Sequence, residues 1–134
     1  MKIGLIGAGR LGICLALLIE KAGYEVLASD NRVDYVNNLQ KGIIDTAEPE
    51  VQQYLSNAKN IEFTTDNIRV IAECDLIFTL VATPSLADGS YDVSAVWKVI
   101  NDFKDIPILL EGKSLVVGCT TNPGDCNDFQ EALK

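Results

Sequence analysis

Three glycines near the start of the chain constrain its fold more than any other feature. Gly7, Gly9 and Gly12 have the spacing G-x-G-x-x-G and follow an apolar run, KIGLI, over residues 2–6. An apolar run that stops at glycine predicts a buried strand, and glycines at this spacing between a strand and a helix are typical of a phosphate-binding loop. The segment YEVLASD predicts a second strand ending at Asp30, so this part of the chain predicts a β-α-β unit.

In such a loop each of the three positions requires glycine for a different physical reason. Gly7 permits the tight turn, Gly9 lets the backbone approach a pyrophosphate that a Cβ atom would strike, and Gly12 lets the helix pack closely on the strand. Free N–H groups and the positive end of the helix dipole then stabilise the phosphates. A glycine-rich strand-to-helix turn that holds no ligand is the simpler alternative.

The rest of the chain alternates apolar strands with helical patterns. The first helix follows the glycines and ends near Gly23; its apolar residues at helical spacing are Leu11, Leu15, Leu18 and Ile19. Further strands are predicted over residues 61–65, 76–81 and 114–120, and further helices over 33–41, 48–58, 66–74, 92–103 and from 125. Solidly apolar strands indicate that both faces of the sheet are covered. We therefore predict an α/β fold, a Rossmann-type doubly wound parallel sheet of about five strands, truncated at its C-terminal side.

Length and composition narrow the possibilities. With 134 residues, 48% of them hydrophobic, and no linker-like stretch, the chain is predicted to form one domain over residues 1–134. Its net charge of −8 would repel a nucleic-acid backbone, so we expect no nucleic-acid partner and expect local N–H groups to hold any phosphate. No apolar run is long enough to cross a membrane, and Arg10 interrupts the one that resembles a secretion signal.

The four cysteines are Cys14, Cys74, Cys119 and Cys126; they form no C-x-x-C pair, and the chain has no histidine. We therefore expect no metal site of the zinc type. Cys14 and Cys74 lie in apolar stretches and are predicted to be small buried residues. A reducing, cytoplasmic setting fits this cysteine usage.

Asp30 gives the glycine loop a partner, because a carboxylate at the end of the second strand can accept hydrogen bonds from an adenosine ribose. Its charge would also repel a 2′-phosphate at ~4 Å by about 4 kcal/mol, which favours NAD over NADP. Arg32 is a counter-signal, since a nearby arginine can accept the 2′-phosphate. The alternative for Asp30 is a solvated acid at a strand end.

Two later segments follow predicted strands. VATPS covers residues 81–85, and GCTTNPG covers residues 118–124. Ligands of open α/β sheets bind beyond the carboxyl ends of the strands, so Thr83 and Thr120 are predicted to face the cofactor. The alternative is that both threonines are ordinary turn residues beside proline.

At this point the sequence resembles the NAD-binding domain of the UDP-glucose/GDP-mannose dehydrogenases. Besides KIGLIGAGRLG, four segments match the family in order: KGIIDTAEPEVQQYL, FTTD, ATPSLADGSYDVSAV and VVGCTTNPGD. The third is the most specific, because it joins a TPS-type turn to D-G-S and D-x-S-x-V. The likeness runs along nearly the whole chain and implies cofactor contacts at Arg10, Leu11, Asp30, Thr83 and Thr120.

Three positions depart from the family pattern. Tyr35 stands where the family usually has a lysine, and Gly118-Cys119-Thr120 stands where it usually has Lys-Ser-Thr. Arg10 occupies a loop position that is often aromatic. These departures leave the fold assignment intact and bear on the affinity for the cofactor and on the identity of the sugar nucleotide.

The resemblance implies an enzyme that oxidises the C6 alcohol of a nucleotide sugar to a carboxylate in two hydride transfers to NAD. In the family, the cysteine nucleophile, its lysine and acidic helpers and most sugar contacts belong to segments that follow the part matched here. We therefore expect no catalytic residue in this chain and a nucleotide-sugar substrate bound through those other segments. Cys119 is not expected to be a nucleophile, because no histidine can activate it.

Two other functions stay open. A stand-alone, non-catalytic NAD-binding module would suit the open strand edge and the short last helix, which also leave room for a homodimer. Another Rossmann dehydrogenase domain, of the 3-hydroxyacid or 6-phosphogluconate type, would share the N-terminal glycines. The segment TPSLADGSYDVS argues against that second alternative.

Overall fold

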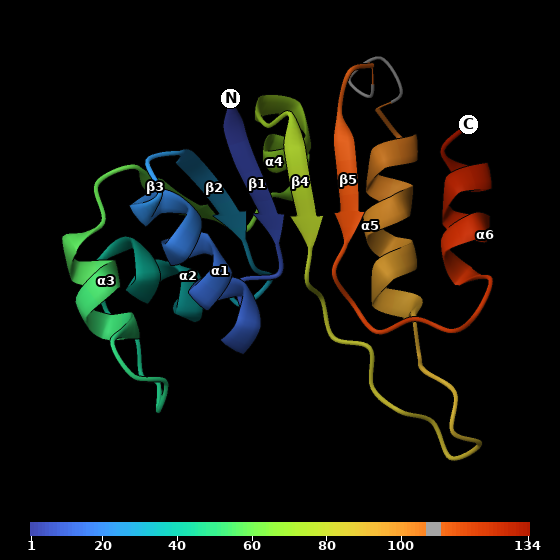
Figure 1. The fold of residues 1–134 in the computed structure, drawn as a ribbon, viewed down its shortest axis with the longest axis horizontal. Helices are drawn as coiled ribbons and strands as arrows, with labels where there is room; N and C mark the ends of the chain where they lie inside the picture. Colours follow the sequence, from blue (N-terminus) through green and yellow to red (C-terminus); the bar gives the residue numbers. More distant parts are fainter. Residues whose placement is uncertain (107–110) are drawn as a thin grey trace.

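A parallel sheet of five strands, in the order β3-β2-β1-β4-β5, organises the chain (Figure 1). The computed structural model describes residues 1–106 and 111–134. The strands are β1 (Lys2–Ile6), β2 (Glu25–Ser29), β3 (Ile61–Thr64), β4 (Leu76–Thr79) and β5 (Ser114–Val117). Neighbouring strands all pair in parallel. The strand order reverses between β1 and β4, which is the arrangement of a doubly wound sheet.

Helices cover the sheet in two layers. The described helices are α1 (Arg10–Lys21), α2 (Val33–Gln40), α3 (Val51–Asn57), α4 (Asn67–Glu73), α5 (Ser94–Lys104) and α6 (Asp125–Ala132). One core joins α1, α2 and α3 to alternate residues of the central strands, such as Leu5 and Ala28. The opposite faces of these strands, at Ile6 and Leu27, join a core with α4 and α5, and α6 packs beside α5 (Figure 1). The predicted α/β Rossmann-type fold is confirmed.

The chemistry of the turns explains where several elements begin. Asp66 caps α4, because its carboxylate accepts hydrogen bonds from the N–H groups of Ile68 and Arg69. Gly23 follows α1 with a φ of +102°, a left-handed conformation that glycine adopts without strain and that commonly ends a helix. Strands β4 and β5 are shorter than predicted, because regular pairing ends at Thr79 and Val117.

The buried face of α1 differs from the one that the apolar spacing indicated. Leu11 and Leu18 are 66% and 54% exposed, whereas the buried residues of the helix are Gly12, Ile13, Ala16 and Leu17. The spacing misled because the small residues Gly12 and Ala16, rather than Leu11 and Leu18, lie on the face that packs against the sheet. Cys74 is buried as predicted, but Cys14, on this same helix, is only half-buried.

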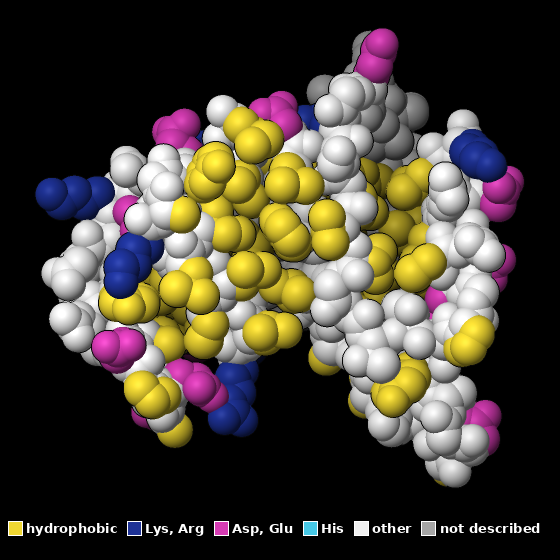
Figure 2. Space-filling view, viewed as in Figure 1, with side chains coloured by type: hydrophobic (Ala, Val, Ile, Leu, Met, Phe, Trp, Pro, Cys, Tyr) yellow, Lys and Arg dark blue, Asp and Glu magenta, His cyan; other side chains and the backbone are white. Residues whose placement is uncertain are grey.

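Coverage of the sheet is also less complete than the apolar strands indicated. Figure 2 shows hydrophobic side chains spread across the middle of the face in view, which carries α1. Leu115 and Val117 of β5 pack toward α5 and α6, whereas Val116, between them, remains 38% exposed. The outermost strand β5 is therefore covered on one face only.

Glu50 carries local backbone strain. It precedes α3 with a φ of +66° and is the one non-glycine residue with positive φ in the part of the chain that the structure describes. A left-handed conformation costs an ordinary residue about 1 kcal/mol, a cost that glycine avoids. We therefore expect Glu50→Gly to raise the free energy of unfolding, measured by urea denaturation, by roughly 0.5–1 kcal/mol.

Gln53→Gly is the matched control, because Gln53 is an exposed residue inside the same helix. Glycine there should lower the free energy of unfolding by about 1 kcal/mol. An unchanged or lowered value for Glu50→Gly would contradict the assignment of strain.

Candidate functional site

The glycine turn joins β1 to α1 at very close range. Gly7 has a φ of +101°, and its N–H donates a hydrogen bond to the carbonyl of Ser29 at 2.9 Å, as that of Ala8 does at 3.1 Å. A Cβ atom on Gly12 would lie 1.9 Å from the carbonyl oxygen of Gly7. No side chain fits there, so these two glycines are required by the backbone itself.

Gly9 differs, because nothing in the described protein requires it to be glycine. Its φ is −70°, which any residue can adopt, and no atom lies within 4 Å of the position that a Cβ would take. Gly9 is also the N-cap of α1, with no side chain described that caps the helix and no acidic residue in its first turn. An uncapped helix N-terminus that faces open space fits the pyrophosphate of a dinucleotide.

This turn opens into a hollow of about 470 Å³. Of the predicted site residues, Gly7, Gly9, Arg10 and Asp30 line it together. The other walls are formed by residues at the carboxyl ends of β1, β2 and β4, by the first turn of α4 and by the first two turns of α5: Ile6, Ser29, Asn31, Arg32, Asn67, Leu80, Val81, Ala82, Ala95, Lys98 and Val99. A crevice at this edge is where open α/β sheets bind ligands.

Asp30 lies at the end of β2 and is engaged by Arg32. The Nε of Arg32 donates to Oδ1 of Asp30 at 2.8 Å and its Nη2 donates to Oδ2 at 3.0 Å, while the backbone N–H of Arg32 donates to Oδ1 at 3.0 Å. Burial would raise the pKa of Asp30, but these hydrogen bonds and the charge of Arg32 outweigh burial and hold the pKa below its usual value. The carboxylate is therefore ionised and paired.

Tyr35 connects this ion pair to the glycine turn. The guanidinium of Arg32 lies over the Tyr35 ring, 4.0 Å from its centroid. The Tyr35 hydroxyl donates a hydrogen bond to the carbonyl of Ala8 at 2.7 Å. Arg32 is the N-cap of α2, and Tyr35 lies three residues later in its first turn, which brings the two side chains together. The sequence singled out Tyr35 only as a departure from a family pattern and did not predict either contact.

A polar network forms the floor between β2 and the helices. Ser29 Oγ donates to Asn67 Oδ1 at 2.7 Å, and Asn67 Nδ2 donates to Asp102 Oδ2 at 3.1 Å. Sequence analysis missed Asn67 and also Lys98, which lines the hollow from α5. The position of Asn67 directly after the helix cap Asp66 was the available signal for it, and nothing in the sequence singled out Lys98.

The other predicted site residues, Leu11, Gly12, Thr83 and Thr120, are not among the residues that line the hollow. Leu11 is the exposed second residue of α1, and Thr83 and Thr120 lie in the loops after β4 and β5. Arg10 extends from the start of α1 and forms an ion pair with Glu48, in the loop between α2 and α3. The loop between α2 and α3, which contains Glu48 and Pro49, therefore contacts the start of α1 beside the glycine turn.

Cys119 also lies just past β5, and its surroundings do not activate it. Its thiol donates to the carbonyl of Thr79 at 3.3 Å, and burial raises the pKa of the thiol above its usual value. The thiol form is therefore favoured over the nucleophilic thiolate.

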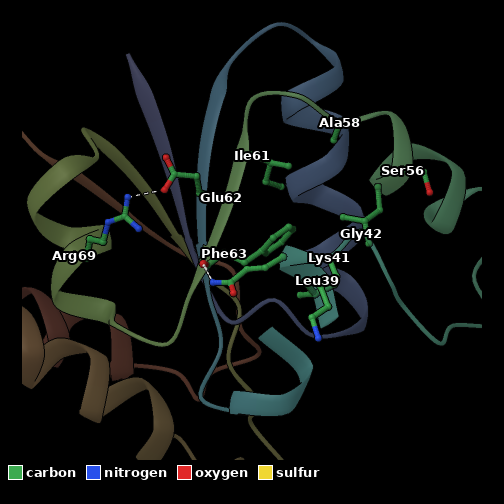
Figure 3. Close-up of a pocket in the computed structure, with 11 residues that line it drawn as sticks. Leu39, Lys41, Gly42, Ser56, Ala58, Ile61, Glu62, Phe63 and Arg69 are labelled. Carbon is green, nitrogen blue, oxygen red and sulfur yellow. Dashed lines mark hydrogen bonds and ion pairs between the residues drawn. The ribbon is translucent and has the colours of Figure 1, made fainter. Parts of the chain in front are cut away.

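A second hollow, of about 570 Å³, lies at the outer edge of β3. Some of its polar side chains are already engaged with the protein, as Figure 3 shows for Arg69 and Glu62. Gln40 Nε2 donates to the Phe63 carbonyl at 2.9 Å, and Arg69 pairs with Glu62 at 2.6 Å. The hollow at the glycine turn is the better candidate, because it combines open space with uncapped backbone donors.

Comparison with known proteins decides the family. The family model described as "UDP-glucose/GDP-mannose dehydrogenase family, NAD binding domain" matches residues 1–134. The chain belongs to this family. The match confirms the resemblance seen in the sequence and confirms NAD as the cofactor of this kind of domain.

Individual members of the UDP-glucose/GDP-mannose dehydrogenase family agree with the match. YtcA of Bacillus subtilis is 31% identical over 133 residues, which cover 99% of this chain and 31% of that protein. The UDP-glucose 6-dehydrogenase of Rhizobium meliloti is 30% identical, with coverage of 99% and 31%. A crystal structure of GDP-mannose dehydrogenase from Pseudomonas aeruginosa has the same fold, with a TM-score of 0.87 at 24% identity, covering 99% of this chain and 31% of that one.

The chain thus spans about a third of the length of the relatives it matches, 31% in each of these cases. In the part that the structure describes, we find no helix with the length and hydrophobicity required to cross a membrane.

The same substitution is expected to change stability at Gly12 but not at Gly9. Gly12→Ala should lower the free energy of unfolding by about 2–3 kcal/mol, because the new Cβ overlaps the Gly7 carbonyl and α1 must move away from β1. Gly9→Ala should leave it within about 0.5 kcal/mol of the parent protein, because the methyl group meets open space. Urea denaturation of the two variants side by side tests this; equal losses of stability would contradict the close helix–strand contact.

Proposed function

We propose that residues 1–134 form a single dinucleotide-binding domain that holds NAD for a nucleotide-sugar 6-dehydrogenase. Such an enzyme oxidises the sugar C6 alcohol to a carboxylate. The observation that carries the proposal is Gly9, a glycine for which the described protein gives no steric reason. A pyrophosphate lying against the turn supplies that reason.

The proposed roles follow from the geometry of the hollow. The pyrophosphate would lie against the segment from Gly7 to Gly12 and accept hydrogen bonds from the N–H groups of Arg10 and Leu11 at the start of α1. The adenosine ribose would lie at Asp30, whose Oδ2 accepts one hydrogen bond from Arg32 and retains a lone pair for a ribose hydroxyl. Thr83 and Thr120, which follow β4 and β5, are proposed to contact the nicotinamide half. The protein would supply binding and orientation, and NAD the capacity to accept hydride.

The nucleotide-sugar substrate and the catalytic cysteine are proposed to reside with segments that the relatives have outside the matched third. Two observations support this assignment. The chain spans 31% of the relatives' length, and Cys119, the cysteine at the edge of the sheet, is held as a hydrogen-bonded thiol. In the alternative, a stand-alone NAD-binding module, the domain would bind NAD in the same way but without catalytic segments working beside it.

Two further points belong to the proposal. A cytoplasmic location follows from the cysteine usage of the sequence. A homodimer is proposed at the outer edge of β5, because an edge strand offers unpaired N–H and carbonyl groups to a second chain.

Calorimetric titration with NAD tests the cofactor site. We expect saturable binding to the parent chain and at least about tenfold weaker binding to Gly9→Ala, because the added methyl group occupies the space of the pyrophosphate. Gly23→Ala is the matched control, since Gly23 also has no atom within 4 Å of its Cβ position but lies at the far end of α1. Because Gly23 has a positive φ, circular dichroism is used to check that this variant is folded. Absence of NAD binding to the parent chain would refute the proposed function.

A second test concerns chemistry. The 134-residue chain mixed with NAD and a panel of UDP- and GDP-sugars should produce no NADH, measured by absorbance at the reduced nicotinamide band. The reason is that the described residues provide no activated nucleophile near the hollow. Steady NADH production with any sugar nucleotide would show that the chain itself is catalytic.

A further inference from the structure

The pairing of Asp30 with Arg32 changes what the adenosine end of the hollow can recognise. An acid at the end of the second strand excludes a 2′-phosphate when its charge is unopposed. Here both carboxylate oxygens accept hydrogen bonds from one guanidinium, at 2.8 and 3.0 Å. The pair is neutral as a whole, so the acid no longer presents an unopposed negative charge.

The guanidinium keeps donors to spare. Arginine has five N–H groups, and the described bonds to Asp30 use the one on Nε and one on Nη2. The Arg32 side chain is 56% exposed and lines the hollow. It can therefore donate to a phosphate in the hollow without releasing Asp30.

The surroundings hold Arg32 in this position. Its guanidinium lies on the Tyr35 ring at 4.0 Å, and the Tyr35 hydroxyl is fixed by the Ala8 carbonyl at 2.7 Å. A guanidinium restrained on two sides loses less conformational entropy when it binds a phosphate. The site is thus preorganised for an anion beside the ribose.

A second cation points to the same ligand. Lys98 of α5 lines the hollow along with Arg32. Among the described lining residues, Arg10, Arg32 and Lys98 are cationic and Asp30 is anionic, in a chain whose net charge is −8. The hollow therefore carries more positive than negative side chains although the chain as a whole is acidic, and Lys98 adds a second cation to Arg32.

We propose that Arg32, assisted by Lys98, forms a subsite for the 2′-phosphate of NADP, so that this domain binds NADP as well as NAD. The inference rests on the proposed function, because it extends the same adenosine site. The ligand class is a 2′-phosphorylated adenosine dinucleotide. Asp30 serves the ribose hydroxyls when NAD is bound, and Arg32 serves the phosphate when NADP is bound.

Calorimetry of the whole chain with NAD and with NADP, in the same buffer, tests the subsite. We expect the two dissociation constants to lie within about tenfold of each other. Arg32→Gln should weaken NADP binding at least about tenfold while changing NAD binding by no more than about threefold. Lys59→Gln is the matched control, because it removes one exposed cation outside the hollow and should leave the ratio unchanged.

A second variant covers the case in which Arg32→Gln disturbs the fold, which thermal denaturation would reveal. Asp30→Asn leaves Arg32 in place and should weaken NAD binding while NADP binding is retained or tightened, reversing the preference. If NAD binds but NADP does not at millimolar concentration, or if Arg32→Gln leaves the ratio unchanged, this inference is wrong and the proposed function stands. If neither dinucleotide binds, both fail.

Discussion

The contact between Gly12 and the Gly7 carbonyl is the constraint on which the rest of the structure depends. Its closeness leaves no room for a side chain, since a Cβ on Gly12 would lie 1.9 Å from that oxygen. The contact fixes how α1 starts, and therefore directs its uncapped N-terminus into the hollow. It also fixes which face of the helix meets the sheet. Gly12, Ile13, Ala16 and Leu17 are buried as a consequence, and Leu11 is turned outward although it is among the more apolar residues of the helix.

The same turn determines where the neighbouring strand can go. The N–H of Leu80 donates to the carbonyl of Ile6 at 2.8 Å, and a Cβ on Gly7 would lie 2.7 Å from the Leu80 carbonyl oxygen. The chain leaving β4 is therefore pressed against the turn that leaves β1. At this point the strand order reverses, so the following helices lie on opposite faces and a crevice opens between them. Residues far apart in sequence, such as Asp30 and Lys98, come to line one hollow for that reason.

The sequence was sufficient to predict the fold and the glycine turn that opens into the hollow. The glycine spacing, the apolar strands and Asp30 are local signals, because each depends on a short segment and on the regular geometry of a β-α-β unit. The side-chain part was not predictable in the same way. Arg32 binds both oxygens of Asp30, and the Tyr35 hydroxyl binds the Ala8 carbonyl. Both contacts depend on how α2 packs against the glycine turn. The prediction of which face of α1 is buried was wrong for a related reason. Hydrophobicity favours leucine at the buried positions, whereas close packing of the helix on the strand favours the small residues glycine and alanine.

The departure at Tyr35 is best understood together with Arg32. The resemblance leads one to expect a lysine, and therefore a cation, at the position of Tyr35. In this chain the cation stands at Arg32, three residues earlier at the N-cap of α2, and the aromatic ring supports it at 4.0 Å. A lysine is a flexible point charge, whereas an arginine can bind a carboxylate through a planar fork and still offer donors outward. The exchange therefore keeps a cation near Asp30, and this cation binds both carboxylate oxygens directly and lines the hollow.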